Sequence, residues 1–308
     1  MPDVMQSWTR AEATAALGRA LRAAQAADGG WPYYAGRASR IEPTAWAMLA
    51  LAAVPGPADA AVDRGRAFLQ QLQQPDGLLL EPGVLVSNYA WNGLALLADI
   101  SSRAATADAN ATWRSALTSG VLAVKGIALE QDGSPVRQNN RLQAWSWIDG
   151  TFSWIEPTAM CVLALKKARA AGDLARARLA EAEAVIVDRV CEGGGWNYGN
   201  AQVLGQDLRP YVPTTAMGVL AMQDRRDHPA IKTSIDWLNA NGVHERSAMA
   251  LSWAAIAERV VGGASDATRQ ALLHEAPGAH AFGNFHLMAM ALYALTLPDH
   301  GARAFSLA

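Results

Sequence analysis

Two glutamates in a repeated motif are the first candidates for chemistry. The pentapeptide Ile-Glu-Pro-Thr-Ala occurs at positions 41–45 and again at 155–159, and each copy opens an apolar segment of helical period. Glu42 and Glu156 are therefore predicted N-caps of two helices, although Ser, Thr, Asp and Asn cap helices better. The repeated choice of glutamate indicates a function beyond capping, and both residues are catalytic candidates.

The chemistry open to these glutamates depends on the pKa of their carboxyl groups. A helix N-terminus carries partial positive charge, so it favours the ionised carboxylate and lowers its pKa. Glu42 and Glu156 are then expected to act as bases, to bind a cation or to orient a neighbour. In the structural alternative, each only complements the helix dipole or binds the arginine before it, which is Arg40 in the first copy.

The aromatic loop before the second copy supplies a candidate acid. Residues 147–154 read Trp-Ile-Asp-Gly-Thr-Phe-Ser-Trp. If apolar neighbours bury Asp149, the pKa of its carboxyl rises and the group can donate a proton. The alternative is that Asp149 and Gly150 only form a turn.

Aromatic side chains near the predicted helix starts are candidates for binding an apolar substrate, because they bury area and present π faces to a cation. The residues predicted to bind substrate in this way are Tyr34, Trp91, Trp147, Trp154, Tyr198 and Tyr211. Arg209, in a polar insertion, is a candidate for binding a phosphate or carboxylate head group. His286, at the start of an apolar segment, completes the predicted binding residues. A solvated loop and a core histidine are the structural alternatives for these two.

The candidates lie within an internal repeat. A third copy, Tyr-Val-Pro-Thr-Thr-Ala-Met, occurs at 211–217, and weaker copies begin near residues 88, 247 and 286. Six copies in 308 residues correspond to about 51 residues per unit. A glycine-rich turn precedes each copy, and the tryptophans of two such turns, Trp31 and Trp196, are expected to pack between neighbouring units.

Each repeat unit reads as a helical hairpin. Amphipathic segments with a polar face precede the glycine turns at 12–27, 63–74, 179–190 and 231–239. The apolar segments after the turns lack charge, as expected for helices buried between an outer layer and a central cavity. The sequence therefore predicts an all-α fold of six hairpins, with alternating outer and inner helices.

Two stretches resemble a known motif. Residues 64–77 read Arg-Gly-x-x-Phe-Leu-x-x-x-Gln-x-x-x-Gly, which resembles the QW motif of squalene and oxidosqualene cyclases, with Leu79 in place of the final Trp. Residues 21–31 resemble the second half of that motif, with the Trp present. The chain is thus similar to the squalene cyclase and protein prenyltransferase repeat superfamily. The resemblance implies a single α6/α6 toroid domain over residues 1–308, with inner and outer rings of helices.

The sequence lacks the motifs that give this superfamily its known activities. The Asp-x-Asp-Asp of triterpene cyclases, the Asp-Asp-x-x-Asp of class I terpene synthases and the Asp-x-Cys of prenyltransferase β subunits are all missing. Cys191 and His286 could still approach each other, as two ligands of the prenyltransferase zinc do. We nevertheless predict neither a metal nor a cofactor, because one cysteine and scattered histidines do not assemble a zinc site easily.

Composition narrows the possible partners and the compartment. The net charge is −2, and no Lys/Arg block provides the basic surface expected for nucleic acid or anionic lipid. Cys161 and Cys191 are too few for a disulfide scaffold and fit a reducing compartment. No apolar stretch has the length of a bilayer span. We therefore expect a cytoplasmic protein, although a toroid with an apolar mouth can still touch a membrane.

Four functions remain open from the sequence. The first is an isoprenoid- or lipid-binding toroid that holds a hydrophobic small molecule in its central cavity, either as a binding protein or as a terpenoid cyclase-like enzyme. The others are a prenyltransferase β-subunit-like protein that needs a partner subunit, a carbohydrate-active α/α barrel with two carboxylates, and a non-catalytic binding module. Substrate, product, oligomeric state and protein partner are not specified by the sequence.

Overall fold

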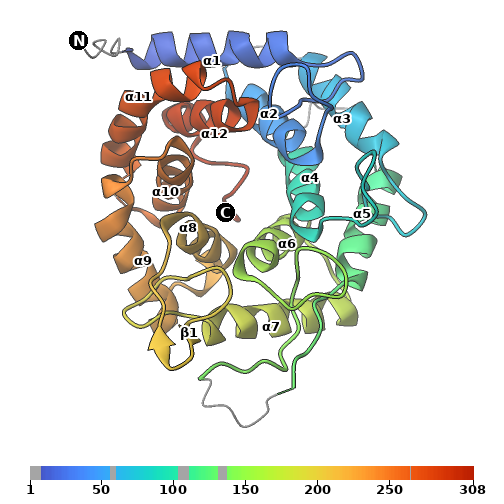
Figure 1. Cartoon of the computed structure of the whole chain (residues 1–308), viewed down its shortest axis with the longest axis vertical. Coiled ribbons are helices and arrows are strands. Elements are labelled where there is room, and N and C mark those ends of the chain that lie inside the picture. Colours follow the sequence, from blue (N-terminus) through green and yellow to red (C-terminus); the bar gives the residue numbers. More distant parts are fainter. Residues whose placement is uncertain (1–7, 56–59, 103–110, 131–136, 264) are drawn as a thin grey trace.

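The computed structural model describes residues 8–55, 60–102, 111–130, 137–263 and 265–308. An inner set of helices surrounds the centre of the molecule, and an outer set packs around it (Figure 1). The inner helices are α2 (Ile41–Ala53), α4 (Tyr89–Ser101), α6 (Ile155–Lys167), α8 (Val212–Ala221), α10 (Ala248–Val261) and α12 (Phe285–Leu295). The outer helices are α1 (Arg10–Ala24), α3 (Ala60–Gln71), α5 (Ala111–Ala123), α7 (Asp173–Asp188), α9 (Pro229–Asn241) and α11 (Ser265–Ala281).

The inner helices form a closed circuit. Each packs against the next in chain order, and α12 packs against α2. Each outer helix from α3 onward packs against the inner helix that precedes it in the chain, and α1 packs on α12. Short elements complete the described part of the chain: the helices α13 (Leu297–His300), η1 (Gln223–Arg225) and η2 (Gly242–His244), and a hairpin of β1 (Gln202–Val203) and β2 (Gln206–Asp207).

The prediction of a mostly helical chain is confirmed. Each inner helix begins within one residue of the motif start given by the sequence, at 41, 88, 155, 211, 247 and 286. The prediction of the outer helices is less accurate, because the helices predicted at 12–27 and 63–74 end about three residues earlier than expected. The sequence pattern did not single out α5 and α11; α11 carries Pro277 in its interior.

The glutamine of the QW-like stretches explains where the outer helices end. Gln25 has left the helical conformation, with φ −61° and ψ 124°. Its side-chain amide donates to the carbonyl oxygen of Gly29 (2.7 Å) and to that of Ala61 on the next outer helix (2.8 Å). Gln73 repeats this arrangement with Gly77 (3.0 Å). The motif therefore ties each glycine turn to the following hairpin.

The tryptophan and threonine of the repeat connect each turn to its own hairpin. Trp31, Trp145 and Trp196 are fully buried. Their indole N–H groups donate to carbonyl oxygens near the ends of the preceding outer helices, at 2.7, 2.8 and 2.7 Å. Their backbone N–H groups donate to the hydroxyls of Thr44 (2.8 Å), Thr158 (3.2 Å) and Thr215 (3.0 Å), respectively. The threonine of the repeated pentapeptide is thus a structural residue.

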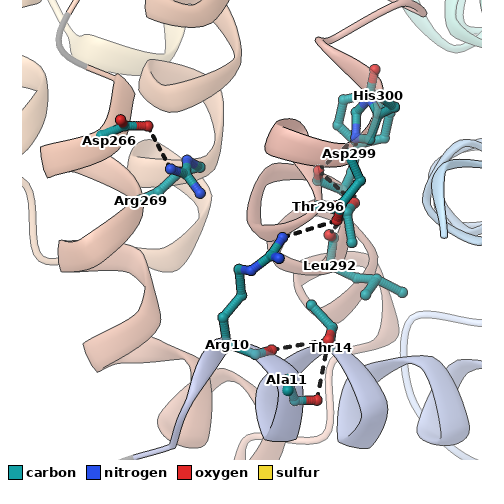
Figure 2. Close-up of polar contacts among 10 residues, drawn as sticks. Arg10, Ala11, Thr14, Asp266, Arg269, Leu292, Thr296, Asp299 and His300 are labelled. Carbon is teal, nitrogen blue, oxygen red and sulfur yellow. Dashed lines mark hydrogen bonds and ion pairs between the residues drawn. The ribbon is translucent and has the colours of Figure 1, made fainter. Parts of the chain in front are cut away.

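The seam between the first and last hairpins combines apolar packing with one ion pair. Leu17 and Leu21 of α1 are fully buried. Arg10 of α1 forms an ion pair with Asp299 of α13 at 2.9 Å, beside Thr296 (Figure 2). Exposed pairs of this kind contribute about 1 kcal/mol or less, so burial between the helices dominates the closure.

None of the helices in the described part of the chain combines the length and apolar character that a membrane span requires.

Glu258 is a buried carboxyl between outer and inner helices. It lies near the end of α10 and is 0% exposed. Neither carboxylate oxygen has a hydrogen-bond partner of normal geometry among the described residues. Burial raises the pKa of Glu258 to about 7, and the nearby Thr268 hydroxyl offsets part of that shift. The folded state therefore favours the neutral acid.

We predict that Glu258→Gln reduces the pH dependence of stability. Because the folded pKa of about 7 exceeds the unfolded value, the wild-type free energy of unfolding should fall as pH rises from about 5 to 8. The loss should be up to roughly 3 kcal/mol, since one pKa unit corresponds to about 1.4 kcal/mol. Urea unfolding at several pH values measures it. Parallel pH profiles for the two proteins would contradict the assignment.

Candidate functional site

The second residues of the inner helices line a central cavity. These residues are Glu42, Ala90, Glu156, Pro213, Met249 and His286. A second layer lies one helical turn further along, because residues i and i+4 share a helix face. It consists of Trp46, Leu94, Met160, Met217 and Trp253. Together with Trp91, Trp147 and Tyr198 they enclose about 250 Å³.

Loops that join the outer and inner helices of one hairpin fix the level at which the inner helix of the preceding hairpin begins. The backbone carbonyls of Tyr33, Trp147 and Tyr198 accept hydrogen bonds from the first N–H groups of α12, α4 and α6, at 2.9, 2.9 and 2.8 Å. The carboxylate of Glu81 does the same for the first N–H of α2 (2.7 Å). Each capping residue stands two positions after the turn tryptophan or, for Glu81, after Leu79. The same loops bring the side chains of Trp147 and Tyr198 to the cavity.

The glutamates occupy a different helix position from the one expected. The N-cap residues of α2 and α6 are Arg40 and Trp154, so Glu42 and Glu156 are each the second helical residue. This shift of two positions matters, because the second residue faces the cavity whereas the N-cap residue does not line it. The structure therefore brings Glu42 and Glu156 to one shared cavity.

Glu156 is a largely buried carboxyl whose pKa is raised. Burial is the main cause, and the negative charge of Glu42 adds to it. The hydroxyl of Thr214 on α8 donates to Oε1 of Glu156 at 3.0 Å and lowers the pKa in part. The expectation that the helix dipole would lower this pKa was wrong, because desolvation of the carboxylate outweighs the dipole at this position.

Glu42 has two close polar neighbours, Tyr33 and the cavity-lining His286. The hydroxyl of Tyr33 donates a hydrogen bond to Oε2 of Glu42. The Nε2 atom of His286 lies 3.7 Å from Oε1. Burial and the nearby carboxylate of Glu42 raise the pKa of Tyr33 well above its usual range, which keeps the phenol protonated as a donor. The structural alternative of a Glu42 pair with Arg40 fails, because Arg40 binds Glu81 instead (3.2 Å).

Asp149 does not occupy the position expected of a buried acid. It is exposed and does not line the cavity. Its carboxylate lies beside the hydroxyl of Tyr89, where burial of the phenol and the charge of Asp149 raise the pKa of Tyr89 to about 12. The burial on which an acid role for Asp149 depends is missing, because residues 148–150 are all exposed; Gly150 has φ +71°, as in a turn.

The predicted binding residues divide into two groups. Those that line the cavity are Trp91, Trp147, Tyr198 and His286, and those that do not are Tyr34, Trp154, Arg209 and Tyr211. Tyr34 and Tyr211 are 40% and 45% exposed. Trp154 and Tyr211 are N-cap residues of α6 and α8. They precede the cavity-facing position by two residues, which turns them away from it. Arg209 is exposed in the loop before α8.

Sequence reasoning missed the deeper wall of the cavity. Trp46, Met160, Met217 and Trp253 each lie four residues after a second helical residue. The i, i+4 spacing from Glu42 and Glu156 was a signal for Trp46 and Met160. Trp253 packs edge-on against Trp46 at 5.2 Å between ring centroids, so these rings form the floor of the cavity.

The cavity has an acidic and aromatic character. Its acidic or basic side chains among the described residues are those of Glu42, Glu156 and His286, with neither Lys nor Arg. Cys191, the other residue considered for zinc, does not line the cavity that holds His286. No group of three or more His, Cys, Asp and Glu residues in the described ranges is arranged to hold a metal ion.

We predict opposite shifts of the Glu156 pKa in two variants. Thr214→Val should raise it further, because the variant removes the hydrogen bond that stabilises the carboxylate. Glu42→Gln should lower it, because the variant removes a like charge. Carbon-13 NMR titration of labelled glutamate measures both. Thr118→Val, which changes a hydroxyl bound within α5, is the control, and shifts of the same sign in both test variants would refute this account of the site.

The fold is similar to that of a terpene cyclase of known structure. Type II terpene cyclase MstE from Scytonema superposes with a TM-score of 0.62 at 17% sequence identity, covering 93% of this chain and 97% of that chain. A variant of MstE in complex with geranylgeranyl dihydroxybenzoate gives a TM-score of 0.61 at 15% identity, covering 96% and 98%. A complex with merosterolic acid A gives 0.62 at 15%, covering 94% and 97%. No family model matches the sequence, and no curated protein matches it significantly. At this level of identity the likeness shows a shared helical fold.

Proposed function

We propose that residues 1–308 form a single α6/α6 toroid whose central cavity binds an isoprenoid or similar apolar molecule, and that Glu156 protonates it in a cyclase-like reaction. The observation that carries the proposal is a buried carboxyl of raised pKa in the wall of an aromatic cavity. A raised pKa favours the protonated form of the carboxyl, which can donate its proton to a bound ligand.

The wall of the cavity suits an apolar ligand that becomes cationic. Trp46, Trp91, Trp147 and Trp253 present indole rings, and three methionines add polarisable surface. Burying apolar area yields about 25 cal/mol per Å², and indole faces attract cations. The lack of Lys and Arg among the described lining residues disfavours an anionic group inside the cavity.

The proposed reaction needs no co-reactant. Glu156 gives its proton to a double bond or to an epoxide oxygen of the ligand, and the electrons of that group form the new bond to hydrogen. The resulting cation closes a ring by attack of another double bond. A base then removes a proton from the product cation, and Glu42 is positioned for that step by Tyr33 and His286. Overall the ligand is isomerised.

The comparisons support the ligand class. MstE, whose fold is similar, has been crystallised with geranylgeranyl dihydroxybenzoate, which carries an isoprenoid chain. The missing Asp-x-Asp-Asp motif means that a different carboxyl must supply the proton in this chain, and Glu156 is our candidate. We also propose a cytoplasmic location, because Cys161 and Cys191 are free thiols.

Turnover of a prenyl substrate in deuterium oxide tests the proposal. Geraniol, farnesol and geranylgeraniol are each incubated with the protein, and the products are analysed by mass spectrometry. We expect a cyclic isomer that carries one deuterium, because the exchangeable proton of Glu156 is transferred to carbon. Glu156→Gln should still bind the substrate but lose turnover by at least about a hundredfold, the usual contribution of a general acid.

Glu192→Gln is the matched control, because Glu192 is exposed on an outer turn. It should retain full activity. Binding without any product in the wild type would favour the non-catalytic binding module. Absence of prenyl binding would overturn the proposal, and binding of oligosaccharides in its place would favour the carbohydrate-active alternative.

A further inference from the structure

The segment after α13 occupies the centre of the molecule. From residue 302 onward the chain turns inward and runs into the middle of the ring of inner helices (Figure 1). Ala302, Ala304 and Phe305 are buried. Buried side chains of this segment therefore fill space along the common axis of the inner helices.

Phe305 lies directly behind the floor of the cavity. Its ring stacks on Trp46 with 5.5 Å between centroids and an angle of 27°. It meets Trp253 edge-on at 5.7 Å and Tyr293 edge-on at 5.3 Å. Trp46 and Trp253 line the cavity, whereas Phe305 is 0% exposed and does not. The two indoles are thus held between the cavity and Phe305.

Polar side chains from the far ends of the inner helices fix this segment in place. The amide of Gln223, just after α8, donates to the carbonyl oxygen of Phe305 (2.8 Å) and accepts from the N–H of Leu307 (2.9 Å). Lys167, the last residue of α6, donates to the carbonyl oxygen of Arg303 (2.7 Å). These hydrogen bonds to the backbone of residues 303, 305 and 307 hold Phe305 in one defined position.

We propose that segment 302–308 is the stopper of the central cavity, and that Phe305 sets the length of the ligand by holding Trp46 and Trp253 in place. The inference rests on the proposed function only in requiring that the cavity binds an apolar chain. A volume of about 250 Å³ lies below the usual range for ligand pockets, about 300–1,000 Å³. The stopper therefore restricts the wild type to short chains.

Removing the Phe305 ring deepens the cavity. Phe305→Ala leaves a space behind Trp46, into which the indole can move when a longer ligand enters. Each additional buried methylene contributes about 0.8 kcal/mol, so room for two of them corresponds to about tenfold tighter binding. Phe305→Leu should give a smaller change in the same direction, and it remains informative if the alanine variant fails to fold.

Binding of two homologous series tests the stopper. The probes are geraniol, farnesol and geranylgeraniol, and separately octanol, dodecanol and hexadecanol, measured by isothermal titration calorimetry. Wild type should favour the shorter members, and Phe305→Ala should move the preference to longer members by about tenfold. Phe282→Ala is the matched control, because Phe282 is 63% exposed beside Tyr34 on the outer surface.

The two series separate this inference from the proposed function. If the prenyl alcohols bind and the length preference is the same in the Phe305 variants, the stopper is overturned and the isoprenoid ligand stands. If only the straight-chain alcohols bind and their preference moves with Phe305, the stopper stands and the isoprenoid ligand is overturned. Absence of binding in both series would overturn both.

Discussion

The architecture depends on hydrogen bonds between the first N–H groups of the inner helices and the loops of the next hairpin. A helix leaves its first N–H groups without internal partners. Here the carbonyl of Tyr198 serves α6 and the carboxylate of Glu81 serves α2. Because the acceptor belongs to the following hairpin, each bond both caps a helix and sets its level relative to the next one. The starts of the inner helices therefore lie around one mouth.

That alignment explains why the cavity has layers. When the inner helices begin at one level, their second residues meet around the axis and residues one turn later form the next layer. The first layer contains the polar groups Glu42, Glu156 and His286, and the second is apolar. The carboxyl groups therefore lie nearer the helix starts than the indoles of Trp46 and Trp253 do.

The helix dipole and desolvation act in opposite directions on the pKa of Glu156, and desolvation is the larger effect. A helix N-terminus stabilises a carboxylate by about 0.3–1 kcal/mol at exposed sites, which corresponds to less than one pKa unit. Removing a carboxylate from water costs several kcal/mol. Glu156 is largely buried and faces a second carboxylate, so its pKa rises. Burial by neighbouring hairpins, and not the motif alone, therefore sets the pKa of Glu156.

The likeness to MstE concerns the helical fold and not the side chains that line the cavity. A shared helical fold provides a central cavity, while the chemistry comes from the side chains placed in it. In this chain the cavity is shaped from both ends, by loop residues such as Trp147 at the mouth and by Phe305 behind the floor. The loop residues are spaced by the repeat, whereas Phe305 lies outside it.

The sequence pattern alone predicts the helical class and the starts of the inner helices, with Glu42 and Glu156 close to two of those starts. These features follow from local periodicity, from the glycine turns and from a motif that recurs along the chain. Which side chains face the axis depends on how the hairpins pack together. A shift of two residues separates the lining residue Glu156 from the N-cap residue Trp154. Burial, which made Glu156 and not Asp149 the candidate acid, arises from neighbouring hairpins. Phe305 is far from Trp46 in sequence, and no local pattern specifies their contact, because it forms only when the ring closes.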